Sequence, residues 1–400
     1  MRPLLVSAAT IASCLGRGAD ATRAALASGA SGLVPCRFES AALETYVGEI
    51  AGVDETRLPG RLSAFDCRNN RAAELGLLQD GFDEAAREAI ARHGAGRVGV
   101  FVGTSTAGIL QTELAYRRRD PADGSLPRDF DYRHTHNTSS VAQYVRARFG
   151  LSGPCAAIST ACSSSAKAFA SAARFIEAGV IDAAIVGGVD TLCLTTLYGF
   201  GSLQLLSPRP CRPYDAQRDG ISIGEAAAFF LLEPATARAD GGAVALLGAG
   251  ESSDAWHMSA PHPEGRGARA AMEAALASAR LGPAAIDYVN LHGTGTQSND
   301  AAEDKAMVAL FGRTVSCNST KGMTGHALGA AGAVEAMACV LAIRHGFVPP
   351  GVGTREVDPA LKARYELAGG RREVKRAMSN SFGFGGSNCS LVFGRLREAA

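Results

Sequence analysis

The sequence predicts an α/β protein that is built from two similar halves. Short apolar runs, each bounded by glycine or polar residues, alternate along the chain with alanine-rich helical stretches. At 400 residues the chain is too long for one ordinary core. It fits two domains of about 150–200 residues each. Alternating strands and helices favour helices that cover a mostly parallel sheet.

The predicted strands are apolar enough to be buried on both faces. They are residues 3–9, 97–103, 181–188, 226–233, 244–248, 286–292, 376–381 and 389–393. The predicted helices between them are rich in alanine and include residues 83–93, 269–280 and 331–345.

A weak internal repeat supports the division into halves. Residues 159–162 (STAC) lead into an alanine- and serine-rich helical stretch that stops at Gly179. Residues 319–326 lead into a second alanine-rich stretch that stops at Gly346. Small residues along both stretches would let them pack closely as buried central helices. We therefore expect two pseudo-equivalent halves, residues 1–240 and 241–400.

Composition excludes some classes of partner. The net charge of +1 gives no reason to expect nucleic acid or an anionic membrane. No apolar run is expected to approach the length of a membrane span. Residues 11–14 (IASC) look like a lipoprotein cleavage box, but the preceding apolar stretch is short and polar in places, so a first strand is favoured. The 10 cysteines form no Cys-x-x-Cys pair and no zinc-ligand spacing, as in a reduced cytoplasmic protein.

Cys162 is the candidate nucleophile. It lies between a polar strand end and a predicted helix, within STACSSS at residues 159–165. A thiol at a helix N-terminus faces the positive end of the backbone dipole and free N–H groups, and both favour the thiolate. Most lone cysteines are small core residues, so this position alone leaves both interpretations open.

Two histidines lie in loops that contain glycine and threonine. His292 is in NLHGTGTQSND, which follows an apolar strand, and His326 is in NSTKGMTGHALGAAG. Thr294 and Thr296 could hydrogen-bond the amide arm of a carrier-bound substrate. One histidine after a strand is more often structural, but a pair in such loops indicates a reaction site.

Three further features have a functional and a plain interpretation. Lys321 and Glu335 are either a buried ion pair or a solvated lysine and an exposed helix carboxylate. The loop NSFGFGGSN, which contains Phe382 and Phe384, could direct backbone N–H groups at a substrate oxygen. It could equally be an ordinary glycine-rich turn between two strands.

These motifs resemble those of the β-ketoacyl-[acyl carrier protein] synthases of the decarboxylating Cys-His-His kind, which share the thiolase fold. The resemblance covers nearly the whole chain in the family's order, and also includes residues 212–215 (RPYD), 224–225 (GE) and 254–261. It implies a thiolase-like fold in helix, sheet, helix, sheet, helix layers. It also implies an acyltransferase that performs decarboxylative condensation in fatty acid or specialised polyketide or polyene synthesis.

The resemblance also implies roles for the candidate residues. Cys162 would take the acyl chain, while His292 and His326 would assist decarboxylation of a malonyl thioester. Lys321 and Glu335 would support the site.

The substrate contacts follow from the same resemblance. Thr294 and Thr296 would meet the phosphopantetheine arm, and Phe382 would contact the substrate from the same loop as Phe384. Phe384 would act as a gate, and its N–H would join that of Cys162 around the thioester oxygen.

Thr106 is the candidate determinant of chain length. By resemblance, residues 102–108 (VGTSTAG) lie near the far end of the acyl pocket, where many family members carry a bulky aliphatic residue. A threonine would leave more room for acyl carbons. Alternatively, its hydroxyl merely bonds the backbone beside a turn.

The implied partners are an acyl carrier protein and a second ketosynthase-like subunit, in a homodimer or a heterodimer. Pairing is expected through a strand at about residues 156–160. The chemistry requires no metal or redox cofactor, since the substrates arrive on phosphopantetheine.

Two departures from the family favour a specialised pathway over housekeeping fatty acid synthesis. Ala226 follows Gly224-Glu225 where a glycine is usual, and residues 163–165 (SSS) are more polar than in many members.

Two alternatives compete with a ketosynthase. A thiolase that does not decarboxylate would place a second cysteine in the C-terminal glycine-rich loop, but residues 382–388 contain none. A non-catalytic chain-length partner would lack the nucleophile, and Cys162 argues against it.

Overall fold

The computed structural model describes residues 1–235 and 243–396. The strands of the N-terminal half are β1 (Leu4–Ser13), β5 (Val98–Gly103), β6 (Cys155–Ile158), β7 (Ala183–Asp190) and β9 (Ala226–Pro234). Those of the C-terminal half are β10 (Val244–Ser253), β11 (Tyr288–Asn290), β12 (Ser316–Asn318), β16 (Arg376–Gly383) and β17 (Ser387–Arg395). Shorter strands are β2 (Gly16–Arg17), β3 (Val34–Pro35), β4 (Tyr46–Gly48), β8 (Ile223–Gly224), β13 (Phe347–Val348), β14 (Arg364–Tyr365) and β15 (Gly370–Arg371).

The two halves repeat one strand order. It is β1-β9-β7-β5-β6 in the N-terminal half and β10-β17-β16-β11-β12 in the C-terminal half. In each half the first two pairings are antiparallel and the last two are parallel. The sheet is therefore mixed rather than mostly parallel, because β9 and β17 run opposite to both of their neighbours. The halves are pseudo-equivalent, as the repeat in the sequence predicts.

The sheets of the two halves are joined to each other. Leu4 pairs with Leu246 and Leu5 with Ala245, so β1 and β10 hydrogen-bond edge to edge. The halves thereby form one 12-stranded sheet. The predicted boundary between residues 240 and 241 lies outside the described residues and stays a prediction.

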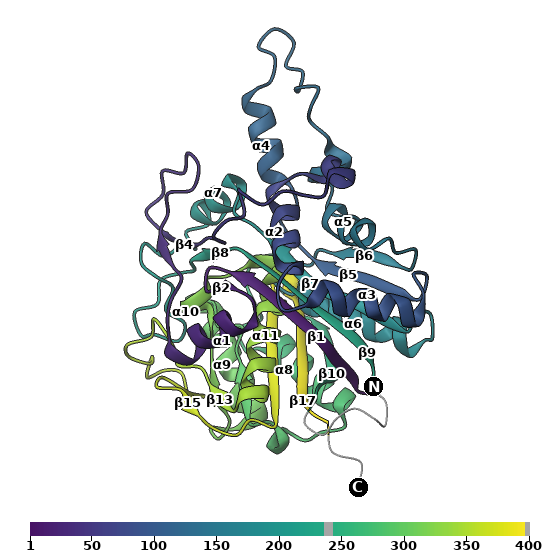
Figure 1. Cartoon of the computed structure of the whole chain (residues 1–400). Coiled ribbons are helices and arrows are strands. Elements are labelled where there is room, and N and C mark those ends of the chain that lie inside the picture. The colour runs from purple at the N-terminus through teal and green to yellow at the C-terminus, as the bar shows by residue number, and fades with distance from the viewer. Residues whose placement is uncertain (236–242, 397–400) are drawn as a thin grey trace.

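Helices cover both faces of each half and form a layer between them (Figure 1). The central layer contains α6 (Ser164–Glu177) and α11 (Ala331–His345), which pack against each other and against strands of both halves. The outer helices are α2 (Arg68–Leu77), α3 (Phe82–His93) and α5 (Ser140–Phe149) on one side, and α8 (Arg266–Ala279) and α9 (Gln297–Phe311) on the other. This is the predicted helix, sheet, helix, sheet, helix layering of a thiolase-like fold.

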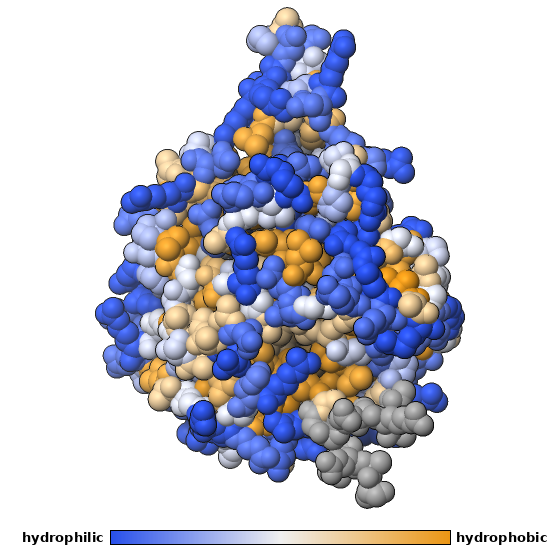
Figure 2. Space-filling view, viewed as in Figure 1, coloured by the Kyte–Doolittle hydropathy of each residue, from blue (hydrophilic) through white to orange (hydrophobic). Residues whose placement is uncertain are grey.

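The remaining helices lie at the margins of these layers. They are α1 (Ala19–Ser28), α4 (Ile109–Arg117), α7 (Leu194–Ser202) and α10 (Lys321–Thr324). Helix α4 and the chain after it project from the body at the top of Figure 1. In Figure 2 the tip of this projection is mostly hydrophilic, while apolar side chains gather at its base and over the middle of the body.

The central layer corrects one expectation about apolar runs. The helical stretch Leu328–His345 has 18 residues and is apolar enough to cross a membrane by length and composition. However, 89% of it is buried inside the protein. A helix enclosed between two sheets is apolar on all sides, which gives it the composition of a membrane span.

Two strand boundaries affect the functional interpretation. Strand β1 continues to Ser13 and pairs with β9 through Ile11 and Ala12, so the first three cleavage-box residues lie within the sheet and Cys14 lies in the turn after it. Strand β11 ends at Asn290, two residues before the predicted end. His292 therefore lies in the loop after the strand.

Candidate active site

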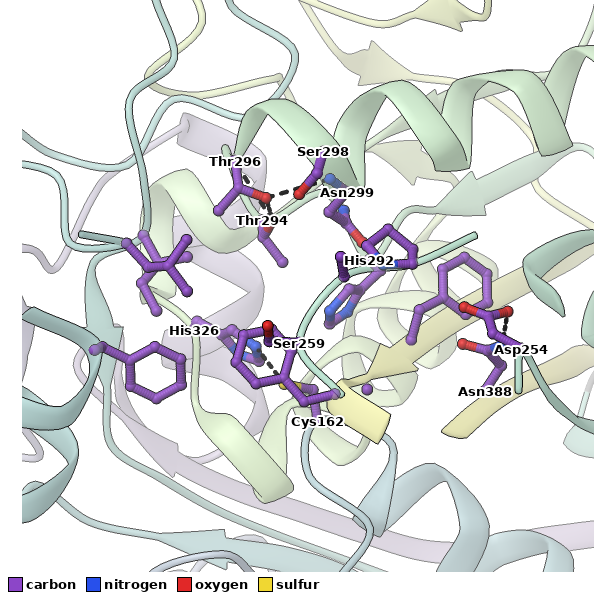
Figure 3. Close-up of a pocket in the computed structure, with 18 residues that line it drawn as sticks. Cys162, Asp254, Ser259, His292, Thr294, Thr296, Ser298, Asn299, His326 and Asn388 are labelled. Carbon is purple, nitrogen blue, oxygen red and sulfur yellow. Dashed lines mark hydrogen bonds between the residues drawn. The ribbon is translucent and has the colours of Figure 1, made fainter. Parts of the chain in front are cut away.

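Three reactive side chains meet at the interface between the halves. Cys162 directly precedes α6 and follows Ala161, whose φ of 54° turns the chain sharply before the helix. Its Sγ lies 3.0 Å from Nε2 of His326. The ring centroids of His292 and His326 are 5.3 Å apart. The three side chains point toward one another from different segments (Figure 3).

The backbone around His326 fixes its tautomer. The backbone N–H of Leu328 donates to Nδ1 at 3.2 Å, so the neutral ring carries its proton on Nε2. The histidine's own N–H donates to the carbonyl oxygen of Ser222 at 2.7 Å. Burial, with the nearby Lys321 charge, lowers the pKa of His326 well below its usual value. His326 is therefore a neutral donor at neutral pH.

Lys321 fixes the tautomer of His292. Its ammonium donates to Nδ1 of His292 at 3.3 Å and to the His292 carbonyl oxygen at 2.5 Å. An ammonium has no acceptor, so the proton of the neutral ring is again on Nε2. Burial, followed by the charge of Lys321, lowers the pKa of His292 well below its usual value.

Lys321 and Glu335 form a buried ion pair rather than two solvated side chains. Their side chains are 1% and 2% exposed, and the ammonium donates directly to Oε1 of Glu335. The Ser381 hydroxyl donates to Oε2 at 3.4 Å. Burial raises the pKa of Glu335 to about 7, although Lys321 opposes the shift.

The ionisation of Cys162 differs from the expectation. Burial raises the pKa of the thiol to about 11, while the Lys321 charge and the backbone N–H of Phe384 act in the opposite direction. Glu335 and Asp190 add to the increase. The loss of water around the thiol therefore outweighs the effect expected of a helix start, and the free thiol is less acidic than its position alone predicts.

A cavity that is partly open to solvent leads to the three side chains. The hydroxyls of Thr294 and Thr296 are 2.9 Å apart on its wall. Phe382 and Phe384 also line it, and the ring centroid of Phe382 is 6.0 Å from that of His292. Figure 3 shows the threonines on one side and the Asp254–Asn388 hydrogen bond on the other.

Among the predicted substrate-binding residues, Thr106 is the one that does not line this cavity. It is buried, and its hydroxyl donates to Asp190 Oδ1 at 2.7 Å. It also accepts the Thr191 N–H at 3.2 Å. This arrangement agrees with the plainer interpretation of a hydroxyl that bonds groups beside a turn.

Sequence reasoning missed a carboxylate behind His292. Glu303 in α9 accepts the N–H groups of His292 and Gly293, both at 2.8 Å, and the Asn380 amide at 3.2 Å. Burial raises the pKa of Glu303 to about 7. Glu303 belongs to an acidic stretch (AAEDK) that is typical of a solvated helix face. Only the packing of α9 against the loop reveals its position.

The chain matches two family models. Residues 1–238 match "Beta-ketoacyl synthase, N-terminal domain" and residues 243–355 match "Beta-ketoacyl synthase, C-terminal domain". The chain is 32% identical to 3-oxoacyl-[acyl-carrier-protein] synthase 2 of Vibrio cholerae over 417 aligned positions, which cover 99% of each protein. It is 39% identical over 305 residues to nodulation protein E of Rhizobium meliloti, covering 74% of this chain and 75% of the relative.

Similarity to solved structures extends over the whole fold. A chain of the structure of the ketosynthase ApeO in complex with its chain length factor ApeC, from Xenorhabdus doucetiae, superposes with a TM-score of 0.90. The two chains are 39% identical, and the superposition covers 99% of this chain and 98% of the other.

Proposed function

This chain belongs to the β-ketoacyl synthase family, and we propose that its condensation takes place on Cys162 with His292 and His326 as the other catalytic residues. The protein is an acyltransferase, a β-ketoacyl-[acyl carrier protein] synthase of fatty acid or polyketide synthesis. The observation that carries the residue assignment is the convergence of one thiol and two Nε2–H donors on one cavity.

The first half-reaction stores the acyl group on the protein. The Cys162 sulfur attacks the thioester carbonyl of the acyl carrier, and the carrier thiolate leaves with the proton that the thiol has lost. The backbone N–H groups of Cys162 and Phe384 would hold the carbonyl oxygen as it becomes an anion. Because the free thiol has a raised pKa, the Nε2–H of His326 contributes by donating to the sulfur as negative charge develops.

The second half-reaction forms the carbon–carbon bond. The bond between the malonyl carboxylate and its neighbouring carbon breaks, CO₂ leaves, and the electron pair passes to the thioester oxygen as an enolate. The Nε2–H groups of His292 and His326 donate to that oxygen. The enolate carbon then attacks the acyl carbonyl on Cys162, and the Cys162 thiolate is expelled.

The supporting residues keep both rings in the donor state. Lys321 occupies Nδ1 of His292, while Glu335 neutralises the lysine charge beside the rings. Thr294 and Thr296 line the approach, where their hydroxyls suit the amides of phosphopantetheine. Phe382 and Phe384 contribute apolar surface to the wall of the cavity.

The competing functions are less consistent with these residues. A thiolase would need a second cysteine beside the rings, and residues 382–388 contain none. A chain-length partner would lack the nucleophile, which is present here with a histidine nitrogen 3.0 Å away.

The partners are an acyl carrier protein and a second ketosynthase-like subunit. Strand β6 is the last strand of the sheet, and its Ala156 is exposed, so an edge is available for pairing. Because the similar ApeO is a ketosynthase in complex with its chain length factor, a heterodimer is favoured over a homodimer. We further propose a specialised pathway, catalysis without a metal or redox cofactor, and a cytoplasmic location.

Intact mass spectrometry tests the assignment of the nucleophile. Incubation with acyl-loaded carrier protein should give one acyl adduct, which peptide mapping places on Cys162. Cys162→Ala should give no adduct, whereas Cys389→Ala should acylate like the wild type. An adduct of full size on Cys162→Ala would refute the assignment.

A further inference from the structure

A second polar cluster lies where the loops after β5 and β7 meet the turn that precedes α11. Asp190, the last residue of β7, is fully buried. Its Oδ1 accepts the hydroxyls of Thr104 at 2.8 Å and Thr106 at 2.7 Å, and the backbone N–H groups of Ser105 and Thr106, both at 2.8 Å. Among the described residues, no lysine or arginine pairs with it. The carboxylate is thus held by hydrogen-bond donors alone, a costly arrangement to bury.

One further contact of Asp190 leads toward the catalytic site. Its Oδ2 accepts the backbone N–H of Ala330 at 3.2 Å, directly before α11. The turn sits so tightly on the carboxylate that a Cβ at Gly329 would lie 2.8 Å from Oδ2. Asp190 therefore fixes the position of the short turn Leu328–Ala330.

That turn also sets the state of His326. Leu328 adopts a φ of 50°, which is unfavourable for a branched side chain, and its N–H donates to Nδ1 of His326 at 3.2 Å. A strained turn needs surrounding contacts to persist. On one side of Leu328 the chain is held through His326, and on the other side it is held through Ala330 and Asp190.

We propose that Asp190 is a positioning residue for His326. By accepting the Ala330 N–H it holds the Leu328–Ala330 turn, whose Leu328 N–H keeps the proton of His326 on Nε2. This inference rests on the proposed function, because it assigns Asp190 to the decarboxylation step.

Asp190 should also affect the ionisation of Cys162, and loss of its charge should help that ionisation while it slows decarboxylation. A residue with a purely structural role would not produce these two opposite changes. The charged groups around the thiol of Cys162 are Lys321, Glu335 and Asp190, with His292 and His326 neutral. The Asp190 charge raises the pKa of Cys162. Removing that charge should make the thiol ionise more easily while decarboxylation becomes slower.

The test compares Asp190→Asn with Thr106→Val and Thr10→Val. Thr106→Val removes one donor to Asp190. Thr10→Val removes a buried hydroxyl that donates to the Gly76 carbonyl at 2.8 Å, away from the cluster. Each protein is assayed for CO₂ release from malonyl carrier protein, for alkylation of Cys162 by iodoacetamide between pH 6 and 10, and for thermal unfolding.

For Asp190→Asn we expect kcat for CO₂ release to fall about tenfold, less than the ~10²–10³ lost when a donor itself is removed, with little change in KM. Its alkylation profile should move to lower pH. Thr106→Val should show a smaller loss of kcat, and Thr10→Val a loss of stability alone. A wild-type kcat and alkylation profile in Asp190→Asn would overturn the proposal.

If Asp190→Asn does not fold, the two threonine variants decide between the outcomes. Equal kcat in Thr106→Val and Thr10→Val would then overturn the proposal. Failure of the wild-type protein to release CO₂ would refute the proposed function instead.

Discussion

In the C-terminal half, the loops after β11 and β16 meet the start of α6, which belongs to the other half. In the N-terminal half, the loops after β5 and β7 meet the start of α11 in the corresponding way. The first junction contains Cys162, His292 and Phe384 beside a cavity. The second contains Thr104, Thr106 and Asp190, joined to one another by hydrogen bonds.

The comparison shows how one repeated architecture can carry two kinds of polar site. Both junctions place polar groups at strand ends, where apolar strands stop and backbone N–H groups are free. In the N-terminal half the hydroxyls of Thr104 and Thr106 and the backbone N–H groups beside them are directed at a single carboxylate. In the C-terminal half the Nε2–H donors of His292 and His326 face space that a substrate oxygen can occupy. The chemistry therefore depends on reactive side chains that one junction carries and the other lacks, and not on the fold alone.

The largest expected effect comes from removing a donor at the open junction. His326→Ala should reduce the rate of malonyl decarboxylation by about 10²–10³, because one of two donors to the enolate oxygen is lost. Acylation of Cys162 should slow by a smaller factor, since His326 only donates to the developing thiolate in that step. Rapid quench with separate acyl and malonyl carrier proteins distinguishes the two rates.

The matched control for that variant is His345→Ala. His345 lies at the exposed C-terminal end of α11 and should leave both rates unchanged. Equal slowing of acylation and decarboxylation in His326→Ala would show that the ring acts as a base on the thiol, contrary to its assigned tautomer.

A second prediction concerns the buried carboxylate of Glu335, which is compensated by a cation, whereas Asp190 is compensated by hydrogen-bond donors. Lys321→Met leaves Glu335 without its cation and should reduce the free energy of unfolding by about 3–5 kcal/mol. Because the folded-state pKa of Glu335 is raised above its unfolded value, stability is present at low pH and falls as the pH rises through about 7. Removing the lysine raises that pKa further, so the loss should be larger at pH 8 than at pH 5.

Denaturant unfolding of two further variants checks this result. Lys321→Met combined with Glu335→Gln should recover much of the stability, because no charge remains buried. Lys305→Met breaks an exposed ion pair with Glu264 and should change the free energy of unfolding by less than about 1 kcal/mol. A loss in Lys321→Met that does not depend on pH would contradict the ion-pair explanation.

Much of the first junction was predictable from the sequence, and the second was not. Cys162 stands out because it lies between a strand end and a predicted helix, and His292 and His326 stand out because each lies in a loop of glycine and threonine. Asp190 also ends an apolar strand (AAIVGGVD), but nothing in the chain shows that Ala330 lies opposite it. Contacts between segments 140 residues apart require the three-dimensional arrangement of the halves.

The same limit explains the other differences. The pairing of β1 with β10 joins edges whose sequences carry no signal of each other. The raised pKa of Cys162 follows from burial by both halves, whereas the sequence shows only its position before a helix. The layering was predictable because the family resemblance implies it, whereas the mixed strand order departs from the mostly parallel sheet that alternating strands and helices favour.

The smallest expected effect concerns Thr106 and the length of the acyl chain. If it is found, the N-terminal junction borders the substrate pocket, and the contrast between the two junctions fails. Thr106→Phe adds bulk where resemblance places the far end of the acyl chain, yet the Thr106 hydroxyl is bonded to Asp190 and Thr191. Thr106→Val loses the same hydroxyl without the bulk, so the two variants separate the effects. If the side chain borders the acyl space, Thr106→Phe should disfavour long acyl carriers relative to short ones by about 1 kcal/mol, or about fivefold, compared with Thr106→Val. Competition between short and long acyl carrier proteins, read by mass spectrometry of Cys162, measures this ratio. An identical ratio in both variants would mean that Thr106 serves only the Asp190 cluster, and that the N-terminal junction is closed to substrate.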